Sequence, residues 1–496
     1  MSLNAACPLA TSKRKERFTA CHYNKLGKSN LYASKISYGS LKLEKDDDSH
    51  TLALDYALSQ GINVIDTSPN FQNGEAEKTL GRQLNDGFYK QQFQRNEIII
   101  MSHGGLIQGR QLTQVKQRKQ LGHPYPNLIS IDDQLAYCIH PDYLNDQLSQ
   151  SLDHLDLSCL DFYLIHQPEI ICLQALKAGE APQKALLKMH EALDQAFDFL
   201  EEQVKDGRIS FYGIASNTLA LHQQNPAHIN LENLISKQHP HFALIQVPCN
   251  LLETQVITEK NQQLSENILT CAQKHDLGVM VTRPLSSLYQ NQKIILKNSH
   301  AAKPTTAPPL SFIELDNLEK QLDDLFVSPE EDKENFDNIK NLFRCSQHCQ
   351  HALKHCIGFE EVKDYFYHIM LPQLHYALSY LYQNYHLEEA QEIWLKNYLS
   401  HFKQIAQISI EKERPAYLEL QQKIKACAQK IFKSQAPLSQ LAIGALAQHP
   451  AISTITVSLK EKDYVDDALE ALNLQLTYSE NLWKNLNNTL RNTLSI

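Results

Sequence analysis

Short runs of apolar residues recur along the chain and alternate with segments in which apolar and polar residues are spaced as in an amphipathic helix. In each run several apolar residues follow one another directly, which is typical of a strand buried on both faces of a parallel sheet. The segments between the runs, such as 141–155 and 184–205, are long enough for helices. The eight runs span residues 33–39, 62–68, 97–103, 159–166, 209–216, 242–249, 277–283 and 452–458.

Strand and helix signals that alternate in this way predict βαβ units. Eight such units close into a barrel, so the pattern predicts an α/β fold, a (β/α)₈ TIM barrel. A doubly wound sheet is the alternative. It needs fewer strands and a glycine-rich first turn, and no GxGxxG follows the run at 33–39. The barrel is therefore the predicted fold.

A long segment interrupts the alternation after the seventh run. About 150 residues separate Arg283 from Ser439, where such a connection usually takes a handful. Apolar and aromatic residues at spacings of three and four predict helices over 371–382 and 390–408. We expect a large, mainly helical insertion that serves as a cap, as a contact surface for a protein partner, or as a stabilising addition. The predicted divisions are a mobile leader (1–22), the first seven barrel units (23–290), the helical insertion (291–435), and the last barrel unit with C-terminal helices (436–496).

The composition is that of an ordinary globular protein and narrows the classes of partner. The chain has 496 residues, of which 42% are hydrophobic and 21% are charged. Its net charge of −9 gives no electrostatic reason to expect nucleic acid or an anionic membrane as a partner. Residues 1–18 lack the apolar run of a secretory signal, and no apolar stretch reaches the roughly 18 residues of a membrane span. We therefore expect a cytoplasmic protein whose eleven cysteines are mostly reduced.

Six segments, taken in their order along the chain, resemble the aldo-keto reductase family. No single motif is decisive, but six in the correct order are specific. The HQPE and QVPCN runs, together with the late insertion, are most similar to a branch of long members. The segments are KLGKSNLYASKISYGSL (25–41), GINVIDTSPNFQNGEAEKTLGRQL (61–84), LDFYLIHQPE (160–169), DGRISFYGIASN (206–217), FALIQVPCNLLE (242–253) and ISTITVSLKEKDYVDDALEAL (452–472).

The resemblance implies metal-free oxidation or reduction of a small carbonyl or alcohol substrate with a nicotinamide nucleotide. A tyrosine hydroxyl delivers the proton to the carbonyl oxygen, a lysine paired with an aspartate lowers the pKa of that tyrosine, and a histidine orients the carbonyl. Carried over by position, the aspartate is Asp66 and the histidine is His166. Taken singly, Asp66 fits a helix cap or an ion pair, and His166 fits a core histidine. Their joint position at two strand ends favours the lining of an active site.

The other two catalytic positions depart from the family. The tyrosine position holds Phe71, which has the shape of tyrosine but no proton to donate. The lysine position holds His103, which can carry a positive charge near neutral pH but is shorter than lysine. General acid catalysis contributes roughly 10²–10⁴ in rate. The resemblance therefore implies weakened or altered chemistry, with His103 or His166 as a substitute acid.

The nicotinamide end of the family's cofactor site is partly retained. Gln246 matches the glutamine that binds the nicotinamide amide. Ser216 and Asn217 resemble a Ser-Asn pair of the family, whereas an ungapped alignment puts Ala215 and Ser216 there.

The phosphate end of that site is mixed in charge. Ser458 and Lys460 stand where the family commonly has a glycine and a basic residue for the 2′-phosphate. Glu461 follows, and an anion at this position would repel that phosphate. The implied cofactor is NADPH, with NADH or no nucleotide as the alternatives.

Cysteine and histidine cluster in the run CSQHCQHALKHC (345–356), whose side chains could hold zinc. The run lacks both a CxxC pair and the CxxCxxC spacing of an iron–sulfur cluster, so packing is the favoured interpretation and no metal is predicted. Cys249 lies near the expected pocket. Without a base beside it, packing is again favoured over a nucleophilic role.

Three functional hypotheses remain. The first is an aldo-keto reductase-like NAD(P)H-dependent oxidoreductase with altered or weakened acid–base chemistry. The second is a catalytically inactive barrel that serves as a nucleotide-binding sensor or protein-interaction scaffold. The third is a metal-binding helical module attached to an inert barrel.

Overall fold

The chain divides into two compact units, which a computed structural model describes over residues 5–44, 47–235, 238–289, 291–297 and 312–494. The first unit comprises Met1–Leu285 and Cys427–Ile496, and the second comprises Ser286–Ala426. The second unit is thus inserted into the sequence of the first.

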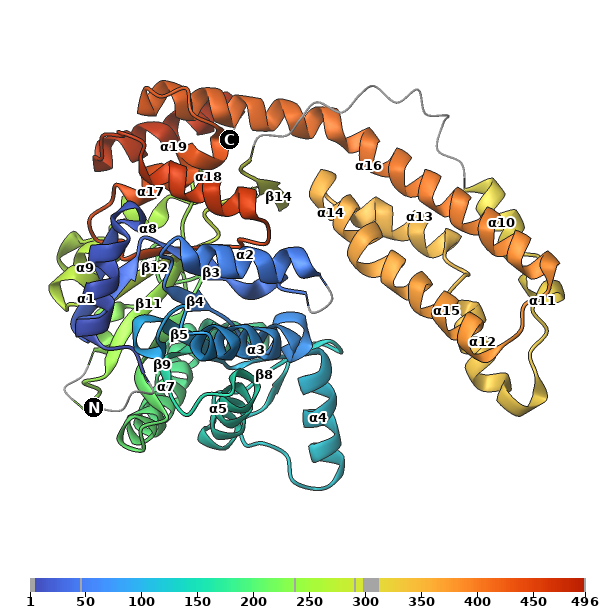
Figure 1. The fold of residues 1–496 in the computed structure, drawn as a ribbon, viewed down its shortest axis with the longest axis horizontal. Coiled ribbons are helices and arrows are strands. Elements are labelled where there is room, and N and C mark those ends of the chain that lie inside the picture. The colour runs from blue at the N-terminus through green and yellow to red at the C-terminus, as the bar shows by residue number, and fades with distance from the viewer. Residues whose placement is uncertain (1–4, 45–46, 236–237, 290, 298–311, 495–496) are drawn as a thin grey trace. The chain divides into compact units, whose positions relative to one another are not determined.

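Eight parallel strands of the first unit close into a barrel in the order in which they follow one another along the chain (Figure 1). Each of the eight predicted runs overlaps one of them, and only β5 extends past its run, by one residue. The (β/α)₈ prediction is therefore confirmed and the doubly wound alternative is wrong. The last strand closes the barrel by pairing with the first. The strands are β3 (Ile36–Gly39), β4 (Val64–Asp66), β5 (Ile99–Gly104), β9 (Leu160–His166), β10 (Ile209–Ala215), β11 (Phe242–Pro248), β12 (Gly278–Thr282) and β15 (Thr454–Val457).

Apolar side chains from these strands fill the barrel. Val64, Ile99 and Phe162 belong to one buried cluster. That cluster also contains Leu26 and neighbouring buried residues of an antiparallel hairpin. The two strands of this hairpin are β1 (Tyr23–Lys25) and β2 (Tyr32–Ser34). The interior is therefore a packed core, and polar side chains that matter for chemistry are confined to the strand ends.

Helices connect most of the strands and cover the barrel. Between β5 and β9 the chain also forms a small antiparallel sheet from β6 (Leu106–Gln108), β8 (Leu135–Tyr137) and β7 (Ile129–Ser130). The helices of this unit are α1 (Pro8–Arg17), α2 (Asp48–Ser59), α3 (Glu75–Tyr89), α4 (Gly109–Gln120), α5 (Pro141–Leu155), α6 (Glu169–Lys177), α7 (Pro182–Lys205), α8 (Gln255–Thr258), α9 (Ile268–Lys274), α17 (Leu438–Ala447), α18 (Lys462–Leu472) and α19 (Glu480–Leu494).

The N-terminal segment differs from the expected mobile leader over residues 1–22. Residues 1–4 lie outside the described part of the chain, but the segment that follows forms α1. Arg14 of this helix is buried, donates hydrogen bonds to the carbonyl oxygens of Leu58 and Ile62, and pairs with Glu97 at 3.4 Å. The leader prediction is therefore wrong for α1. The sequence suggests that the basic side chain of Arg14 is exposed to solvent, whereas the structure buries it.

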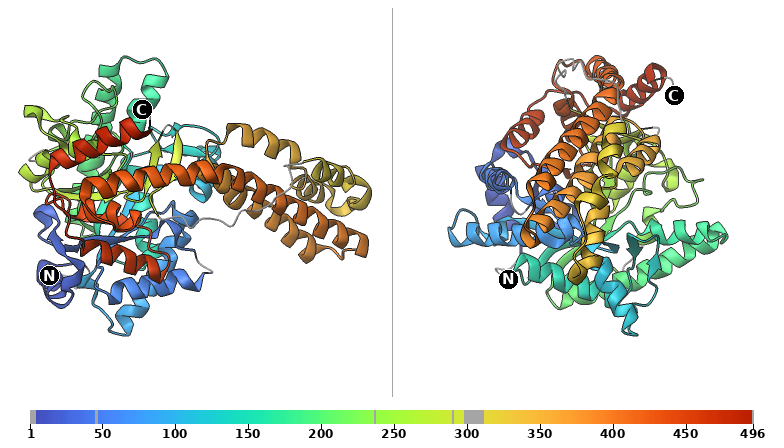
Figure 2. Two further views of the ribbon diagram at one scale, coloured as in Figure 1. Left: turned by 90° about the horizontal axis from the view of Figure 1, so that it is seen from above. Right: turned by 90° about the vertical axis from the view of Figure 1, so that its right-hand side faces the viewer.

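The second unit is mainly helical, as predicted for the insertion after the seventh strand. It opens with a hairpin of β13 (Ser286–Tyr289) and β14 (Gln292–Ile295). In both views of Figure 2 its shorter helices lie beside the first part of the long helix α16, and Trp394 of α16 donates a hydrogen bond to the carbonyl of Leu318. The helices are α10 (Ile313–Glu319), α11 (Leu322–Leu325), α12 (Lys333–Asn341), α13 (Ser346–His355), α14 (Phe359–Asp364), α15 (Leu371–Asn384) and α16 (Glu389–Phe432).

Among the helices that the structure describes, none combines the length and the apolar character needed to cross a membrane.

Candidate active site

Four of the sequence-predicted site residues lie at the carboxyl ends of barrel strands. Asp66 ends β4, His103 is the penultimate residue of β5, His166 ends β9, and Gln246 lies near the end of β11. All of these strands are parallel neighbours in one barrel, so their carboxyl ends meet at the same face. This is the face on which barrels of this type build their active sites.

His103 is the centre of a buried hydrogen-bond network. Its Nδ1 lies 2.6 Å from the carbonyl oxygen of Thr67, and its Nε2 lies 3.1 Å from Oε1 of Gln246. The amide nitrogen of Gln246 donates in turn to Oδ2 of Asp66 at 3.0 Å. In this orientation of Gln246 both ring nitrogens of His103 face acceptor oxygens. A buried histidine held by two hydrogen bonds therefore stands at the position where the resemblance places the family's lysine.

Asp66 is the carboxylate partner of this imidazole. Its Oδ1 lies 3.6 Å from Nε2 of His103. Burial raises the pKa of Asp66, while His103, Gln246 and Thr456 oppose that rise. His103 and the two hydrogen-bond donors therefore oppose the effect of burial on this carboxylate, and burial remains the larger cause.

His166 lies beside His103, with the two ring centroids 5.3 Å apart. Burial lowers the pKa of His166 to about 3, and the neighbouring His103 acts in the same direction. Its Nδ1 has no hydrogen-bond partner in the described part of the chain. His166 is therefore a neutral imidazole at neutral pH, suited to hydrogen-bonding a carbonyl oxygen and not to donating a proton from a charged ring.

Phe71 opens the 3₁₀ turn η4 (Phe71–Gly74), which precedes α3. Its backbone N–H donates to the carbonyl of Ser68 at 3.0 Å, and its side chain is half-buried. Gln72 and Asn73 in the same turn have φ of 51° and 55°, so this loop has a tight left-handed course. The position carries an aromatic ring without an ionisable group.

The residues proposed for the nicotinamide end follow the end of β10. Ala215 is the last residue of that strand and pairs in register with both His166 and Gln246. Ser216 is buried, its N–H donates to the carbonyl of Gln246, and its Oγ accepts from the N–H of Thr218. Asn217 is exposed. Both members of the predicted pair therefore lie just beyond the strand, on the same face as the histidines.

The residues proposed for the phosphate end follow β15. Ser458 is exposed, and Nζ of Lys460 lies 3.9 Å from Oε1 of Glu461. Glu461 is also the residue that precedes the first turn of α18. A helix N-terminus favours an anion, and Glu461 already supplies one there. The site therefore offers one cation, Lys460, whose positive charge is partly compensated by the carboxylate of Glu461.

Two contributors to this face were missed in the sequence. The carbonyl of Thr67 belongs to the backbone, so no residue pattern could have shown it. Glu169 lies within the quoted HQPE run and is 2% exposed; burial raises its pKa, and it accepts a hydrogen bond from the N–H of Asn217 at 2.8 Å. The position of Glu169, three residues after His166, was the sequence feature from which its place near the site could have been predicted.

The cysteines singled out in the sequence pack against neighbours. Burial raises the pKa of the Cys249 thiol, which is not accessible to solvent. Sγ of Cys345 lies 2.9 Å from the hydroxyl of Tyr398, and Sγ of Cys349 lies 3.4 Å from that of Tyr365. These contacts fit hydrogen-bonded core thiols.

Comparison with known proteins gives a family. The sequence model of the Aldo/keto reductase family matches residues 35–355. Over 303 residues the chain is 20% identical to the uncharacterized oxidoreductase YqkF of Bacillus subtilis (strain 168), covering 61% of this chain and 77% of that one. Among solved structures, the holo form of aldo-keto reductase AKR11C1 from Bacillus halodurans is 13% identical with a TM-score of 0.45, covering 95% of each chain. The glycerol dehydrogenase AKR11B4 from Gluconobacter oxydans is 14% identical with a TM-score of 0.48, covering 96% of this chain and 97% of that one. Because the family model spans more than half of the sequence, the chain belongs to the aldo/keto reductase family and is an oxidoreductase of that type.

Proposed function

We propose that the protein is an NAD(P)H-dependent oxidoreductase for a small carbonyl or alcohol substrate, in which His103 replaces the family's lysine and no tyrosine donates the proton. The observation that carries this proposal is the contact between His103 and Asp66. Nε2 of His103 lies 3.6 Å from the Asp66 carboxylate while both ring nitrogens face acceptors. The chain therefore keeps a buried imidazole–carboxylate pair where the family has its lysine and aspartate.

The residues at the strand ends fit a nicotinamide nucleotide at its reactive end. Ser216 and Gln246 offer a hydroxyl and an amide next to each other, since the Ser216 N–H donates to the Gln246 carbonyl. Gln246 already uses its side chain on His103 and Asp66. A nicotinamide amide would therefore share or exchange these hydrogen bonds. When bound, the nucleotide supplies the hydride.

The chain's own groups divide the remaining work. His166, neutral and with Nδ1 unpartnered among the described residues, hydrogen-bonds the substrate oxygen. The proton nearest to this position is held on Nε2 of His103, whose ring lies 5.3 Å from that of His166. Phe71 offers shape only. Proton delivery from a ring N–H that is already hydrogen-bonded to Gln246 is slower than delivery from a tyrosine hydroxyl free to face the substrate, so turnover is weak.

NADPH is the proposed nucleotide, with NADH as the alternative. Lys460 favours a 2′-phosphate as a point charge, and Glu461 at 3.9 Å opposes it. The test is thermal denaturation of the full chain with each nucleotide, followed by turnover with a panel of aldehydes and ketones. A nucleotide present at 100 times its Kd stabilises the folded protein by about 2.7 kcal/mol. If neither nucleotide raises the melting temperature, the oxidoreductase proposal fails.

A catalytically inactive barrel is the second candidate, acting as a nucleotide-binding sensor or as a scaffold that contacts protein partners through its helical unit. Phe71 favours it, because an aromatic ring without a hydroxyl removes the family's proton donor. Stabilisation by NADPH without turnover of any carbonyl substrate would support this candidate over the first.

A further inference from the structure

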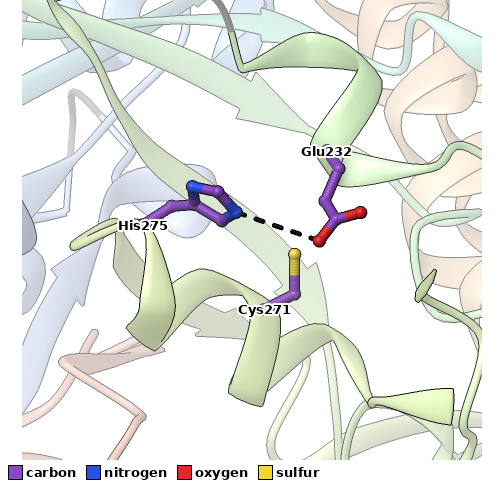
Figure 3. A group of neighbouring side chains, drawn as sticks. All are labelled: Glu232, Cys271 and His275. Carbon is purple, nitrogen blue, oxygen red and sulfur yellow. Dashed lines mark ion pairs between the residues drawn. The ribbon is translucent and has the colours of Figure 1, made fainter. Parts of the chain in front are cut away.

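Three side chains from two segments that are far apart in the sequence meet on the helical layer around the barrel. They are Glu232 from the 3₁₀ turn η6 (Leu231–Leu234) and Cys271 and His275 from α9 and its C-terminal cap. Their possible ligand atoms all lie within 4.8 Å of one another, the only such group of three found in the described ranges of the chain. Figure 3 shows the thiol, the imidazole and the carboxylate turned toward a common point.

We propose that Glu232, Cys271 and His275 bind one zinc ion. Thiolate, imidazole and carboxylate are the ligand types that zinc takes in proteins. Cys271 and His275 are four residues apart, which puts them on the same face of α9. Nε2 of His275 lies 3.9 Å from Oε1 of Glu232. Tetrahedral zinc holds such atoms roughly 3.3–3.6 Å apart, so small side-chain rotations complete the site, with water as the fourth ligand.

Local charge favours a divalent cation at this point. The ammonium of Lys274 is already paired with the carboxylate of Glu266. The carboxylate of Glu232 faces the Cys271 thiol and the His275 imidazole and supplies negative charge at the point where the ion would bind. When zinc binds, the Zn–S bond forms and the thiol proton is released to solvent.

The backbone of the site is held in place without the ion. The N–H of Leu231 donates to Oε1 of Gln262 at 2.9 Å, and Asn230 caps η6 by accepting from the N–H of Glu232 at 3.0 Å. Cys271 is fully buried, whereas the His275 side chain is 36% exposed and that of Glu232 is 22% exposed. The ligand positions are therefore fixed, and the exposed edge of His275 gives an ion a route in.

The location indicates a structural role. His275 stands three residues before the start of β12 at Gly278, so it lies toward the amino-terminal end of that strand, away from the face that carries Asp66 and His166. The amino-terminal face of such barrels contributes to stability and not to chemistry. The connection from β10 to β11 contains η6 and no α-helix within its described residues. Bound zinc would cross-link the irregular connection between β10 and β11 to α9.

The test uses the full chain, stripped with EDTA and titrated with Co²⁺ as a spectroscopic substitute for zinc. We expect one equivalent to give a thiolate-to-cobalt charge-transfer band that Zn²⁺ abolishes. Cys271→Ser should lose the band, and Glu232→Gln and His275→Gln should weaken binding at least ~10-fold, since even the outer partners of metal ligands contribute 10–100-fold. Zinc should also raise the melting temperature of the wild type and not of Cys271→Ser.

Matched variants keep the proposal falsifiable. Cys349→Ser removes a thiol from the 345–356 run and should leave the band unchanged, as should Cys172→Ser in α6. His275→Gln alters a partly exposed side chain, so it tests the site even if Cys271→Ser does not fold. A band that survives His275→Gln and Cys271→Ser, a band lost in Cys349→Ser, or no cobalt band in the wild type would each overturn the proposal.

Discussion

Nε2 of His103 lies 3.6 Å from Oδ1 of Asp66, at the carboxyl ends of two neighbouring strands of the barrel. In the proposed function this pair takes the place of the family's lysine and aspartate. The departure at Phe71 has no such compensation, because a phenyl ring cannot hold a transferable proton. The two altered positions of the tetrad are therefore unequal, and this difference can be measured.

Restoring the hydroxyl alone should restore most of the chemistry. We expect Phe71→Tyr to raise kcat for nucleotide-dependent carbonyl reduction by roughly 10²–10⁴, the contribution of a positioned general acid. Adding His103→Lys should change kcat little, because in the proposed function His103 already takes the lysine's place beside Asp66. Phe71→Leu is the control and should gain nothing. A gain confined to the double variant would show that His103 does not act as the cation.

Nucleotide preference should respond to the acidic neighbour of Lys460. Glu461→Ser removes an anion 3.9 Å from Nζ of Lys460. Two unit charges about 4 Å apart in water interact by about 1 kcal/mol, so the Kd for NADPH should fall about fivefold. The Kd for NADH should not change, because NADH has no 2′-phosphate. Fluorescence titration with both nucleotides measures this difference, and an equal effect on both would mean that the phosphate lies elsewhere.

The barrel could be predicted from the sequence because each of its strands is recognised from residues that follow one another directly. Each strand is a contiguous apolar run, as in 97–103, and the runs carry Asp66 and His166 at their ends. Relationships between distant residues could not be read in this way. The anchor of Arg14 lies 44–48 residues away at Leu58 and Ile62, and a carbonyl oxygen leaves no mark in a residue pattern. Likewise, Glu232 is 39 residues from Cys271, so no short motif joins them.

The buried Arg14 should be essential for the N-terminal helix. Arg14→Ala would remove the guanidinium donor from three backbone carbonyls and one of two cations that pair with Glu97. Breaking a buried pair of this kind costs about 3–5 kcal/mol. Denaturation in urea should show this as a lower midpoint for the barrel, and trypsin should cleave within α1.

Arg17→Ala is the matched control for that variant. Arg17 pairs with the same carboxylate, but 52% of its side chain is exposed. Exposed ion pairs contribute about 0–1 kcal/mol, so the urea midpoint should move little. Equal losses in the two variants would mean that α1 is not held by the burial of Arg14.

His166 should make the folded protein sensitive to acid. Burial lowers its pKa from 6.5 to about 3 in the folded state. Between these values the unfolded chain binds a proton that the folded protein does not, so the free energy of unfolding falls as pH drops below 6.5. The contribution is complete above pH 6.5. At pH 5 the loss is about 2 kcal/mol, since one pKa unit corresponds to 1.36 kcal/mol.

His166→Gln should therefore flatten the acid limb of the stability profile. Glutamine has no proton to gain, so the free energy of unfolding should fall less between about pH 7.5 and pH 5 than it does in the wild type, by about 2 kcal/mol. Asp66 titrates in both proteins, and its contribution largely cancels in the comparison. His123→Gln, which removes an exposed histidine, is the control and should keep the wild-type slope. Urea denaturation at the two pH values measures the difference. Parallel profiles for wild type and His166→Gln would show that His166 has the same pKa in the folded and the unfolded protein, and its burial as a neutral imidazole at pH 5 would then be wrong.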